Sequence, residues 1–230
     1  MPASPLISVI IPVRNASKYI GEAIESIRQQ KIDATLEIIV VDDGSTDDSG
    51  DIAQNLGCKV ICIPPSGPIK ARNTGLESAQ GNFILFADAD DILCENALAT
   101  MYNELIDDPQ LQVALAMRKD FISPDYAIDG QNSEPVRPDP YFGAIAGCAL
   151  IRREVFDVTG KFDESLQMSG DAMAWLMDLQ SKAVKTKKIQ CVAVNRRIHS
   201  NNMGKTNKAQ EYKDYLKILL SRSNMRKQTQ

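Results

Sequence analysis

The chain has 230 residues, of which 43% are hydrophobic and 24% are charged, and its formal net charge is -4. This length is enough for one domain with a sizeable core, and the composition is ordinary for a globular protein. The slight excess of acidic residues argues against nucleic acid as a partner, because binding a phosphate backbone normally requires a basic face.

Four apolar, β-branched runs lie in the first part of the chain, and segments with helical spacing separate them. Because these runs are continuous rather than alternating, they predict strands buried on both faces, as in a parallel sheet covered by helices. We therefore expect an α/β fold with a Rossmann-like, mostly parallel central sheet flanked by helices in a single domain. The predicted strands are 8–13, 37–41, 59–63 and 83–87.

The segments between these strands predict three helices. The first has one apolar stripe from Tyr19 to Ile27, and the second opens with the turn and N-cap residues 43–49 and ends at Gly57. The third, 69–76, has helical propensity except at Gly75.

The second half of the chain is less regular. Residues 123–141 are rich in proline and polar residues and predict a long loop, which in a compact domain is usually functional or disordered. From Lys208 onward, apolar residues recur on one helical face. The predicted elements are helices 96–106, 153–158 and 171–183, strands 113–117, 144–152 and 189–194, and a C-terminal amphipathic helix.

Acidic residues follow two of the predicted strands. Asp42 and Asp43 end the second strand, Asp88 and Asp90 follow the fourth, and Arg14 follows the first. Ligands of open parallel sheets bind outside the carboxyl ends of the strands, so these residues are expected to face one crevice. Crowded carboxylates repel one another unless a cation lies between them, and oxygen ligands of this kind suit Mg²⁺ or Mn²⁺. The plainer alternative is a solvated acidic turn.

The chain resembles a family 2 glycosyltransferase of the GT-A type, the inverting enzymes that use nucleotide sugars. The resemblance covers nearly the whole chain, because five short motifs occur in the order and at the spacing typical of that family. Each motif alone is weak. The motifs are Ser8-Val9-Ile10-Ile11-Pro12-Val13-Arg14-Asn15, Ile39-Val40-Val41-Asp42-Asp43-Gly44-Ser45-Thr46-Asp47, Ala71-Arg72-Asn73-Thr74-Gly75-Leu76, Asp88-Ala89-Asp90 and Gly160-Lys161-Phe162-Asp163-Glu164.

The resemblance implies a role for several residues. Asp43 would accept a hydrogen bond from the nucleotide base, and Arg72 would reach the donor phosphates or ribose. Asp90 would bind Mn²⁺ or Mg²⁺ together with His199, the chain's only histidine. Asp171 would be the general base. The full set of implied nucleotide-sugar contacts is Pro12, Arg14, Asp43, Arg72, Asp88 and Ala89.

Each of these roles has a plainer alternative. Asp43 can form an Asx-turn that caps the next helix, Arg72 can be an exposed helical arginine, and His199 can be a packing residue. Asp171 can simply stabilise a helix N-terminus. Relatives often have Glu-Asp at this last position, whereas this chain has Gly170-Asp171, which weakens any inference about how the acceptor is oriented.

Three further acids receive structural predictions. Asp91 is expected to cap the helix that follows it. Asp163 and Glu164 are expected to form a turn before the segment that carries the base.

These inferences predict a metal-dependent, inverting transferase that moves a sugar from a nucleotide-diphosphate sugar, which we expect to be a UDP-sugar, to an acceptor hydroxyl by single displacement. Residues 1–204 would form the catalytic domain, with donor binding in 1–117 and acceptor binding in 118–204, and 205–230 the helix and tail. The alternatives are a sugar-1-phosphate nucleotidyltransferase, although the early glycine-rich loop of those enzymes is missing, and a non-catalytic donor-binding or scaffolding homologue.

Partners and location follow from the same features. The acceptor is a carbohydrate, a glycolipid or a peptide, and we expect no nucleic acid. The apolar start at 6–13 is too short to span a bilayer and lacks a basic region before it, so we expect neither a signal peptide nor a transmembrane segment. Five scattered cysteines predict reduced thiols and hence a cytoplasmic protein, which can touch the inner face of the membrane or a partner through its C-terminal helix.

Overall fold

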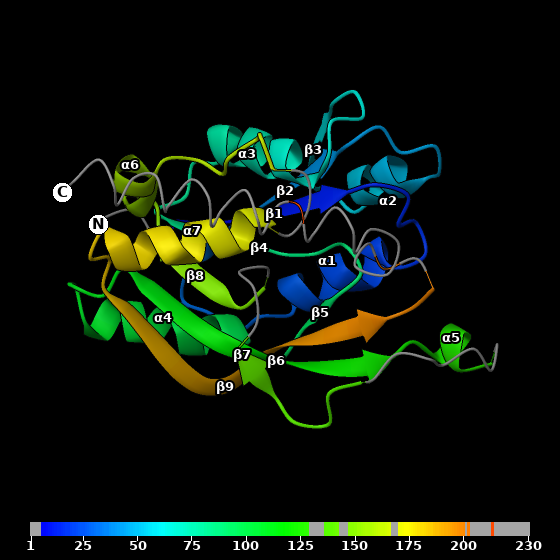
Figure 1. The fold of residues 1–230 in the computed structure, drawn as a ribbon. Helices are drawn as coiled ribbons and strands as arrows, with labels where there is room; N and C mark the ends of the chain where they lie inside the picture. The colour runs from blue at the N-terminus through cyan, green and yellow to red at the C-terminus, as the bar shows by residue number, and fades with distance from the viewer. Residues whose placement is uncertain are drawn as a thin grey trace.

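A nine-stranded sheet organises the chain in the computed structural model, which describes residues 6–128, 136–142, 147–166, 170–200, 202 and 213 (Figure 1). The strand order is β3-β2-β1-β4-β8-β6-β9-β5, and β7 pairs with β6 outside this path. The strands are β1 (Leu6–Val13), β2 (Thr35–Asp42), β3 (Lys59–Cys62), β4 (Phe83–Phe86), β5 (Ile92–Leu93), β6 (Val113–Ile122), β7 (Tyr141–Phe142), β8 (Ala149–Arg152) and β9 (Thr186–Ile198).

The predicted parallel sheet is confirmed for the first four strands. β1 pairs in parallel with both β2 and β4, and β2 pairs in parallel with β3. The other half of the sheet is mixed, because β8 runs antiparallel to β4 and β6, whereas β9 runs parallel to β6. The carboxyl ends of the first strands therefore meet at one edge, with Val13 opposite Asp42.

Helices cover both faces of the sheet. In Figure 1, α3, α6 and α7 lie on one side of the strands, and α1 and α4 lie on the other. The helices are α1 (Ile20–Arg28), α2 (Ser49–Asn55), α3 (Pro68–Ser78), α4 (Ala97–Asp107), α5 (Pro124–Ile128), α6 (Val155–Thr159) and α7 (Gly170–Ser181).

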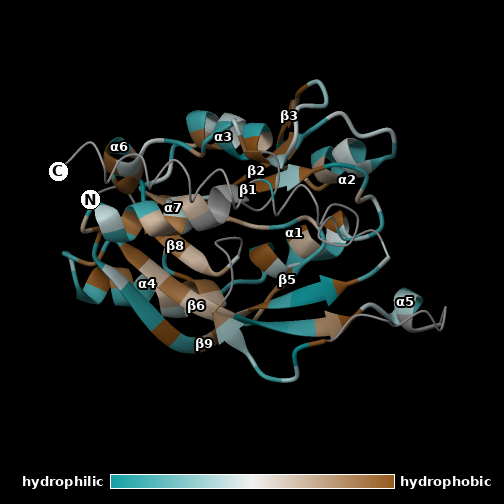
Figure 2. Cartoon of the chain, in the orientation of Figure 1, coloured by the Kyte–Doolittle hydropathy of each residue, from teal (hydrophilic) through white to brown (hydrophobic). Residues whose placement is uncertain are grey.

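The core follows the apolar runs of the sequence. Side chains of β1 such as Ile7, Ile10 and Ile11 are fully buried, and each contributes about 1.5–3 kcal/mol of hydrophobic free energy. Figure 2 shows the carboxyl-terminal part of β9 and the neighbouring shaft of β6 as hydrophilic, while the tip of β6 is hydrophobic. β4, by contrast, is buried along its whole length. The sheet thus has an apolar centre and a polar extension.

Gly75 explains why α3 contains a glycine in its interior. A Cβ atom at this position would lie 2.3 Å from Ile10 Cγ2 and 3.2 Å from Val41 Cγ2, so only glycine lets α3 approach β1 and β2 this closely. The helix penalty of glycine is about 1 kcal/mol, and the close packing of α3 on the sheet offsets it.

Several predictions about local structure are wrong, and β9, for example, spans Thr186–Ile198 and extends beyond the predicted 189–194 at both ends. β6 continues to Ile122, well beyond the predicted 113–117, because its second half pairs with β9 and is not fully buried. The predicted loop 123–141 contains α5 at its start and Tyr141 of β7 at its end. Asp91 does not cap α4, whose N-cap is Asn96, because β5 intervenes.

Two other predictions concern the ends of the chain. The C-terminal helix of residues 205–230 lies outside the described residues, apart from Lys213. Within the described ranges, no helix combines the length and hydropathy needed to cross a membrane.

Candidate active site

The ends of β1, β2 and β4 bring the predicted site residues to one edge of the sheet. Asp43 follows β2 and donates its backbone N–H to Val13 O (2.9 Å), and Ala87 after β4 donates to Ile10 O (2.9 Å). Arg14 Nη1 lies 3.9 Å from Asp43 Oδ2. Pro12 lies one residue before the end of β1, where it pairs with Val41.

The loops after β1 and β2 hold each other in place. Thr46 N donates to Asn15 Oδ1 (2.7 Å), and Asn15 N donates to Ser45 Oγ (3.1 Å). Asn15 has a left-handed backbone (φ 53°), a conformation that asparagine tolerates better than most residues. Arg14 therefore extends from a loop whose conformation is fixed by the neighbouring loop.

Asp43 anchors the segment before α3. Its side chain is only 3% exposed, and it accepts hydrogen bonds from Ser66 N (2.6 Å) and Gly67 N (2.9 Å). The predicted Asx-type interaction occurs instead at the preceding residue, where Asp42 Oδ1 accepts from Ser45 N (2.8 Å). A carboxylate has about four acceptor sites, so Asp43 retains capacity for the predicted contact with a base.

An open cavity of about 520 Å³ adjoins this segment. Its size is in the range of small-molecule sites. Ser66 and Gly67 therefore connect Asp43 directly to this cavity. The lining residues are Ser66, Gly67, Pro68, Ile69, Lys70, Glu164 and Leu166.

α3 places Arg72 beside the acids that follow β4. Arg72 Nη2 lies 3.5 Å from Asp88 Oδ1, and its side chain is only 14% exposed, so it is not the exposed helical arginine of the plainer alternative. Burial raises the pKa of Asp88, the positive charge of Arg72 opposes this rise, and the charge of Asp90 adds to it. Ala89, between the two acids, is buried.

Asp90 and His199 are in direct contact, although 109 positions separate them in the sequence. His199 Nε2 lies 2.9 Å from Asp90 Oδ2, and Asn202 Nδ2 donates to the same oxygen at 3.3 Å. His199 is itself held by its backbone, which donates to Asn202 Oδ1 (2.6 Å), and by the ring of Tyr19 at 4.6 Å between centroids. The histidine predicted as a metal ligand therefore lies against the predicted aspartate.

Asp91 follows Asp90 in the turn, and its side chain faces β9. Its Oδ1 accepts a hydrogen bond from Arg197 N (2.9 Å). Burial raises the pKa of Asp91 well above its ordinary value, and the charges of Asp90 and Asp88 raise it further. The turn after β4 thus concentrates negative charge that a divalent cation would relieve.

Arg197 is the main residue that the sequence analysis missed. Its side chain is 6% exposed, and it donates from Nε to Asp90 O (2.9 Å), from Nη1 to Ser123 Oγ (3.3 Å) and from Nη2 to Glu22 Oε2 (2.5 Å). The guanidinium also lies 5.0 Å from the centroid of the Tyr19 ring. Arg197 joins α1, Ser123 after β6 and the Asp-Ala-Asp turn, and it fixes the backbone at Asp90.

The segment 162–166 forms the turn expected before the base-bearing helix. Leu166 N donates to Asp163 O (3.1 Å), and Ser165 N donates to Asp163 Oδ1 (2.9 Å). Asn73 of α3 ties this turn down, because its side chain bonds Phe162 N (3.0 Å), Phe162 O (2.9 Å) and Glu164 Oε1 (2.9 Å). Asp163 and Glu164 are therefore engaged in structural contacts.

Asp171 lies in the first turn of α7, which begins at Gly170. The placement of the Asp171 side chain lies outside what the structure describes. Its role as the base stays a prediction.

Whether the site fits a metal ion depends on the donor atoms that the chain offers. Within the described ranges, no group of three or more His, Cys, Asp or Glu side chains forms a ready metal cage. Mg²⁺ and Mn²⁺ sites in phosphate-transferring enzymes are often built from one or two protein ligands, with substrate phosphates and water completing the shell. Asp90 Oδ2 and His199 Nε2 fit that pattern.

Comparison with known proteins identifies the family. Residues 8–160 match the profile described as "Glycosyl transferase family 2". The chain belongs to glycosyl transferase family 2. This membership favours sugar transfer over the nucleotidyltransferase alternative.

The relatives bear names of the same kind. The chain is 40% identical over 108 residues to the glycosyltransferase GlyG of Streptococcus pneumoniae, covering 44% of this chain and 36% of that protein. It is 36% identical over 120 residues to the minor teichoic acid biosynthesis protein GgaA of Bacillus subtilis, covering 48% of this chain and 27% of that protein. The chain thus spans only about a third of the length of these two relatives.

Solved structures show the same fold. S. aureus TarS 1-349 in complex with UDP-GlcNAc superposes with a TM-score of 0.70 at 22% identity, covering 87% of this chain and 60% of that one. The same protein in complex with UDP gives a TM-score of 0.67 at 24% identity, covering 84% of this chain and 60% of that one. At this identity the similarity establishes the GT-A fold alone.

Proposed function

We propose that this chain transfers a sugar from a nucleotide-diphosphate sugar, with UDP as the nucleotide, to an acceptor hydroxyl with inversion at the anomeric carbon. The observation that carries the proposal is the contact between Asp90 and His199 at the edge where β1, β2 and β4 end. The structural similarity to TarS, which was solved with UDP and with UDP-GlcNAc, supports the choice of nucleotide.

The donor would lie along the strand ends. Its base would reach the Asp43 region and the adjoining cavity of about 520 Å³, while Pro12 and Arg14 border the same edge. Arg72 would face the donor on the side of Asp88, with which it already pairs. A guanidinium suits diphosphate oxygens because it presents several N–H donors in a fixed plane.

Asp90 and His199 would hold Mn²⁺ or Mg²⁺. Such an ion supplies Lewis-acid stabilisation for the charge that develops on the leaving nucleoside diphosphate. The chain contributes the orientation of these ligands: Arg197 and Asn202 fix Asp90, and Asn202 and Tyr19 fix His199. Supports of this kind typically change metal affinity by 10- to 100-fold.

Asp171 would take the proton from the acceptor. The acceptor oxygen forms a bond to the anomeric carbon as the bond to the diphosphate oxygen breaks, and the hydroxyl proton passes to the Asp171 carboxylate. A hydroxyl is far too weakly acidic for an ordinary carboxylate to deprotonate beforehand, so this transfer accompanies bond formation. The position of Asp171 in the first turn of α7 is compatible with the role, although Gly170 replaces the glutamate usual in relatives.

The acceptor and location are also part of the proposal. A carbohydrate, glycolipid or peptide acceptor would bind the 118–204 part of the chain, and the protein would work in the cytoplasm or at the inner face of the membrane. The name of GgaA, a minor teichoic acid biosynthesis protein, is consistent with a role in polysaccharide assembly.

Binding of UDP with and without Mn²⁺ tests the donor site. We expect Asp90→Asn to lower the Mn²⁺-dependent affinity for UDP by roughly 10- to 100-fold. Asp51→Asn on the exposed face of α2 carries the same change and should bind UDP like the native chain. Equal affinity of the native chain for UDP with and without Mn²⁺ would contradict the metal site.

Turnover tests the base and separates an enzyme from a non-catalytic homologue. Asp171→Asn should keep UDP binding and lower transfer by roughly 10²- to 10⁴-fold. The product should have the inverted anomeric configuration. If the native chain binds UDP but releases none from any UDP-sugar in the presence of acceptors, the scaffolding alternative replaces the enzyme.

A further inference from the structure

Three arginines surround one tyrosine. The tyrosine belongs to β7, and the arginines belong to β6, to β9 and to the segment before β7. The guanidiniums of Arg118 and Arg137 lie 5.0 Å and 4.3 Å from the centroid of the Tyr141 ring. Tyr141 donates its hydroxyl to Asp120 Oδ1 (2.7 Å), and Arg196 Nη1 lies 3.6 Å from the same oxygen. We call these five residues the arginine cluster.

Strand pairing explains why these side chains share one face. Arg118 and Asp120 are two residues apart on β6, so they point the same way. Asp120 pairs with Arg196 on β9, and Arg118 pairs with Tyr141 on β7. Arg197, the next residue of β9, points to the opposite face, where it holds the turn at Asp90.

The charges of the arginine cluster do not balance. The cluster contains three guanidiniums and a single carboxylate, that of Asp120, which is 3% exposed and lies beside Arg196. Arg118 is the least satisfied member: its Nε is out of contact with solvent and has no hydrogen-bond partner in the described part of the chain. A partly buried cation without an oxygen partner costs free energy, and a bound oxyanion would recover it.

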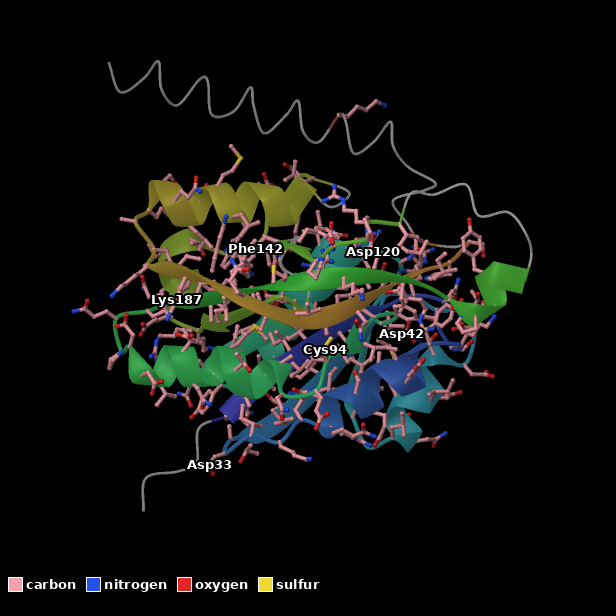
Figure 3. The ribbon with its side chains drawn as sticks, turned by 90° about the horizontal axis from the view of Figure 1, so that it is seen from below. Asp33, Asp42, Cys94, Asp120, Phe142 and Lys187 are labelled. Atoms are coloured by element: carbon pink, nitrogen blue, oxygen red, sulfur yellow. The ribbon has the colours of Figure 1, made fainter. Side chains whose placement is uncertain are left out.

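The arginine cluster also lies beside the proposed donor site. The backbone N–H of Arg197 binds Asp91, so Arg196, one position earlier, adjoins the acidic turn. Arg118 and Asp120 of β6 lie beside this part of β9, because Asp120 pairs with Arg196 and Arg118 pairs with Val194. Figure 2 shows the same parts of β6 and β9 as hydrophilic, and in Figure 3 Asp120 lies in the same half of the molecule as Asp42, away from Lys187 at the other end.

We propose that the arginine cluster binds a phosphate group carried by the acceptor. The inference rests on the proposed function, because it assigns the acceptor half of the same reaction. Three guanidiniums that come from different segments present donors in several planes, which suits a tetrahedral oxyanion, whereas the planar fork of one arginine matches a planar carboxylate. The guanidiniums of Arg118 and Arg137 both contact the Tyr141 ring, and these contacts help to orient them.

Titration with sn-glycerol 3-phosphate, a simple phosphate ester, tests the cluster without knowledge of the acceptor. Glycerol serves as the uncharged probe and glycerate as the carboxylate probe. The titrations are run calorimetrically on the full chain, once alone and once with saturating UDP and Mg²⁺ so that the donor site is occupied. We expect glycerol phosphate to bind in both conditions, glycerate more weakly and glycerol not at all.

Substitutions assign the binding to the cluster. Arg118→Gln and Arg137→Gln should each weaken the binding of glycerol phosphate by roughly 10- to 100-fold, the effect of one charge-assisted hydrogen bond. Arg118→Lys should recover part of it, because lysine keeps the charge without the planar fork. Arg28→Gln, on the exposed face of α1, removes the same charge and should change nothing. Arg137 is exposed, so its substitution does not threaten folding.

The outcomes separate this inference from the proposed function. If UDP fails to bind but glycerol phosphate binds and depends on Arg118 and Arg137, the donor proposal fails and the anion site stands. The site is overturned if UDP abolishes the binding of glycerol phosphate, if Arg28→Gln weakens it as much as Arg137→Gln does, or if glycerate binds as well as glycerol phosphate.

Discussion

Two helical glycines of this chain should respond in opposite ways to the same substitution. A Cβ at Gly75 would lie 2.3 Å from Ile10 Cγ2, whereas carbon atoms pack at about 3.5–4.0 Å. Ile10 and Val41 are both fully buried in the middle of the sheet, so neither can yield easily. A Cβ at Gly21 of α1 would meet only Ile52 Cγ2, at an ordinary 3.8 Å.

The balance between helix propensity and packing cost determines whether each substitution stabilises or destabilises the chain. Alanine gains about 1 kcal/mol over glycine in a helix interior, and overpacking a core costs typically about 1–3 kcal/mol. Because the clash at Gly75 exceeds 1 Å, we place its cost at the upper end. Gly75→Ala should therefore lower the free energy of unfolding by about 1–2 kcal/mol. Gly21→Ala should raise it by a smaller amount, up to about 0.5 kcal/mol, because Gly21 lies in the first turn of α1.

Urea denaturation followed by far-ultraviolet circular dichroism measures both variants. For a chain of this size, 1 kcal/mol corresponds to about 2–4 °C in melting temperature, which thermal melts would confirm. Gly75→Ala should also weaken UDP binding, because α3 carries Arg72. A Gly75→Ala variant as stable as the native chain would show that α3 can move away from β1 at little cost, and the packing argument would be refuted.

Three further outcomes are expected. Asn73→Ala should destabilise the chain by about 2–4 kcal/mol in urea denaturation, because it orphans both backbone groups of Phe162; a loss below about 0.5 kcal/mol would mean that the turn re-bonds elsewhere. Hydrogen bonds from Lys18 and Ser123 lower the pKa of Asp125. Its ionised carboxylate therefore stabilises the fold above the unfolded pKa, and this contribution fades as the pH falls. Between about pH 5 and pH 3, the Asp125→Asn variant should therefore lose less stability than the native chain. Burial raises the pKa of Cys148 to about 12, so a thiol reagent at pH 8 should modify the exposed Cys62 and leave Cys148 intact by mass spectrometry until the chain unfolds.

The parallel half of the sheet could be predicted because its strands are continuous apolar runs. β6 was predicted too short for the converse reason: after Met117 it continues as Arg118, Lys119 and Asp120, a polar pattern that reads as a loop although it pairs with β9 throughout. α5 and β7 were missed because the prolines nearby discourage regular structure. Sequence periodicity reports burial, and these segments are only partly buried.

The acids of the site could be located from the strand ends, but their partners could not. The bonds of Asp43 to Ser66 and Gly67 join residues more than twenty positions apart and have no sequence signal. Arg197 stands beside Arg196 in the sequence, and nothing in that pair says which one is buried. The pleat of β9 sends one to each face, and only the packed fold reveals that division.

β9 therefore sets the distance between the two halves of the proposed site. Neighbouring positions on it serve the nucleotide side through Arg197 and the arginine cluster through Arg196, so their separation is set by the pleat rather than by any mobile loop. The face to which each side chain of β9 points depends on the irregular pairing with β6 between Leu115 and Arg118. Inserting or deleting one residue of β9 after that irregularity would exchange the two arginines, and both binding surfaces would be lost in a single step.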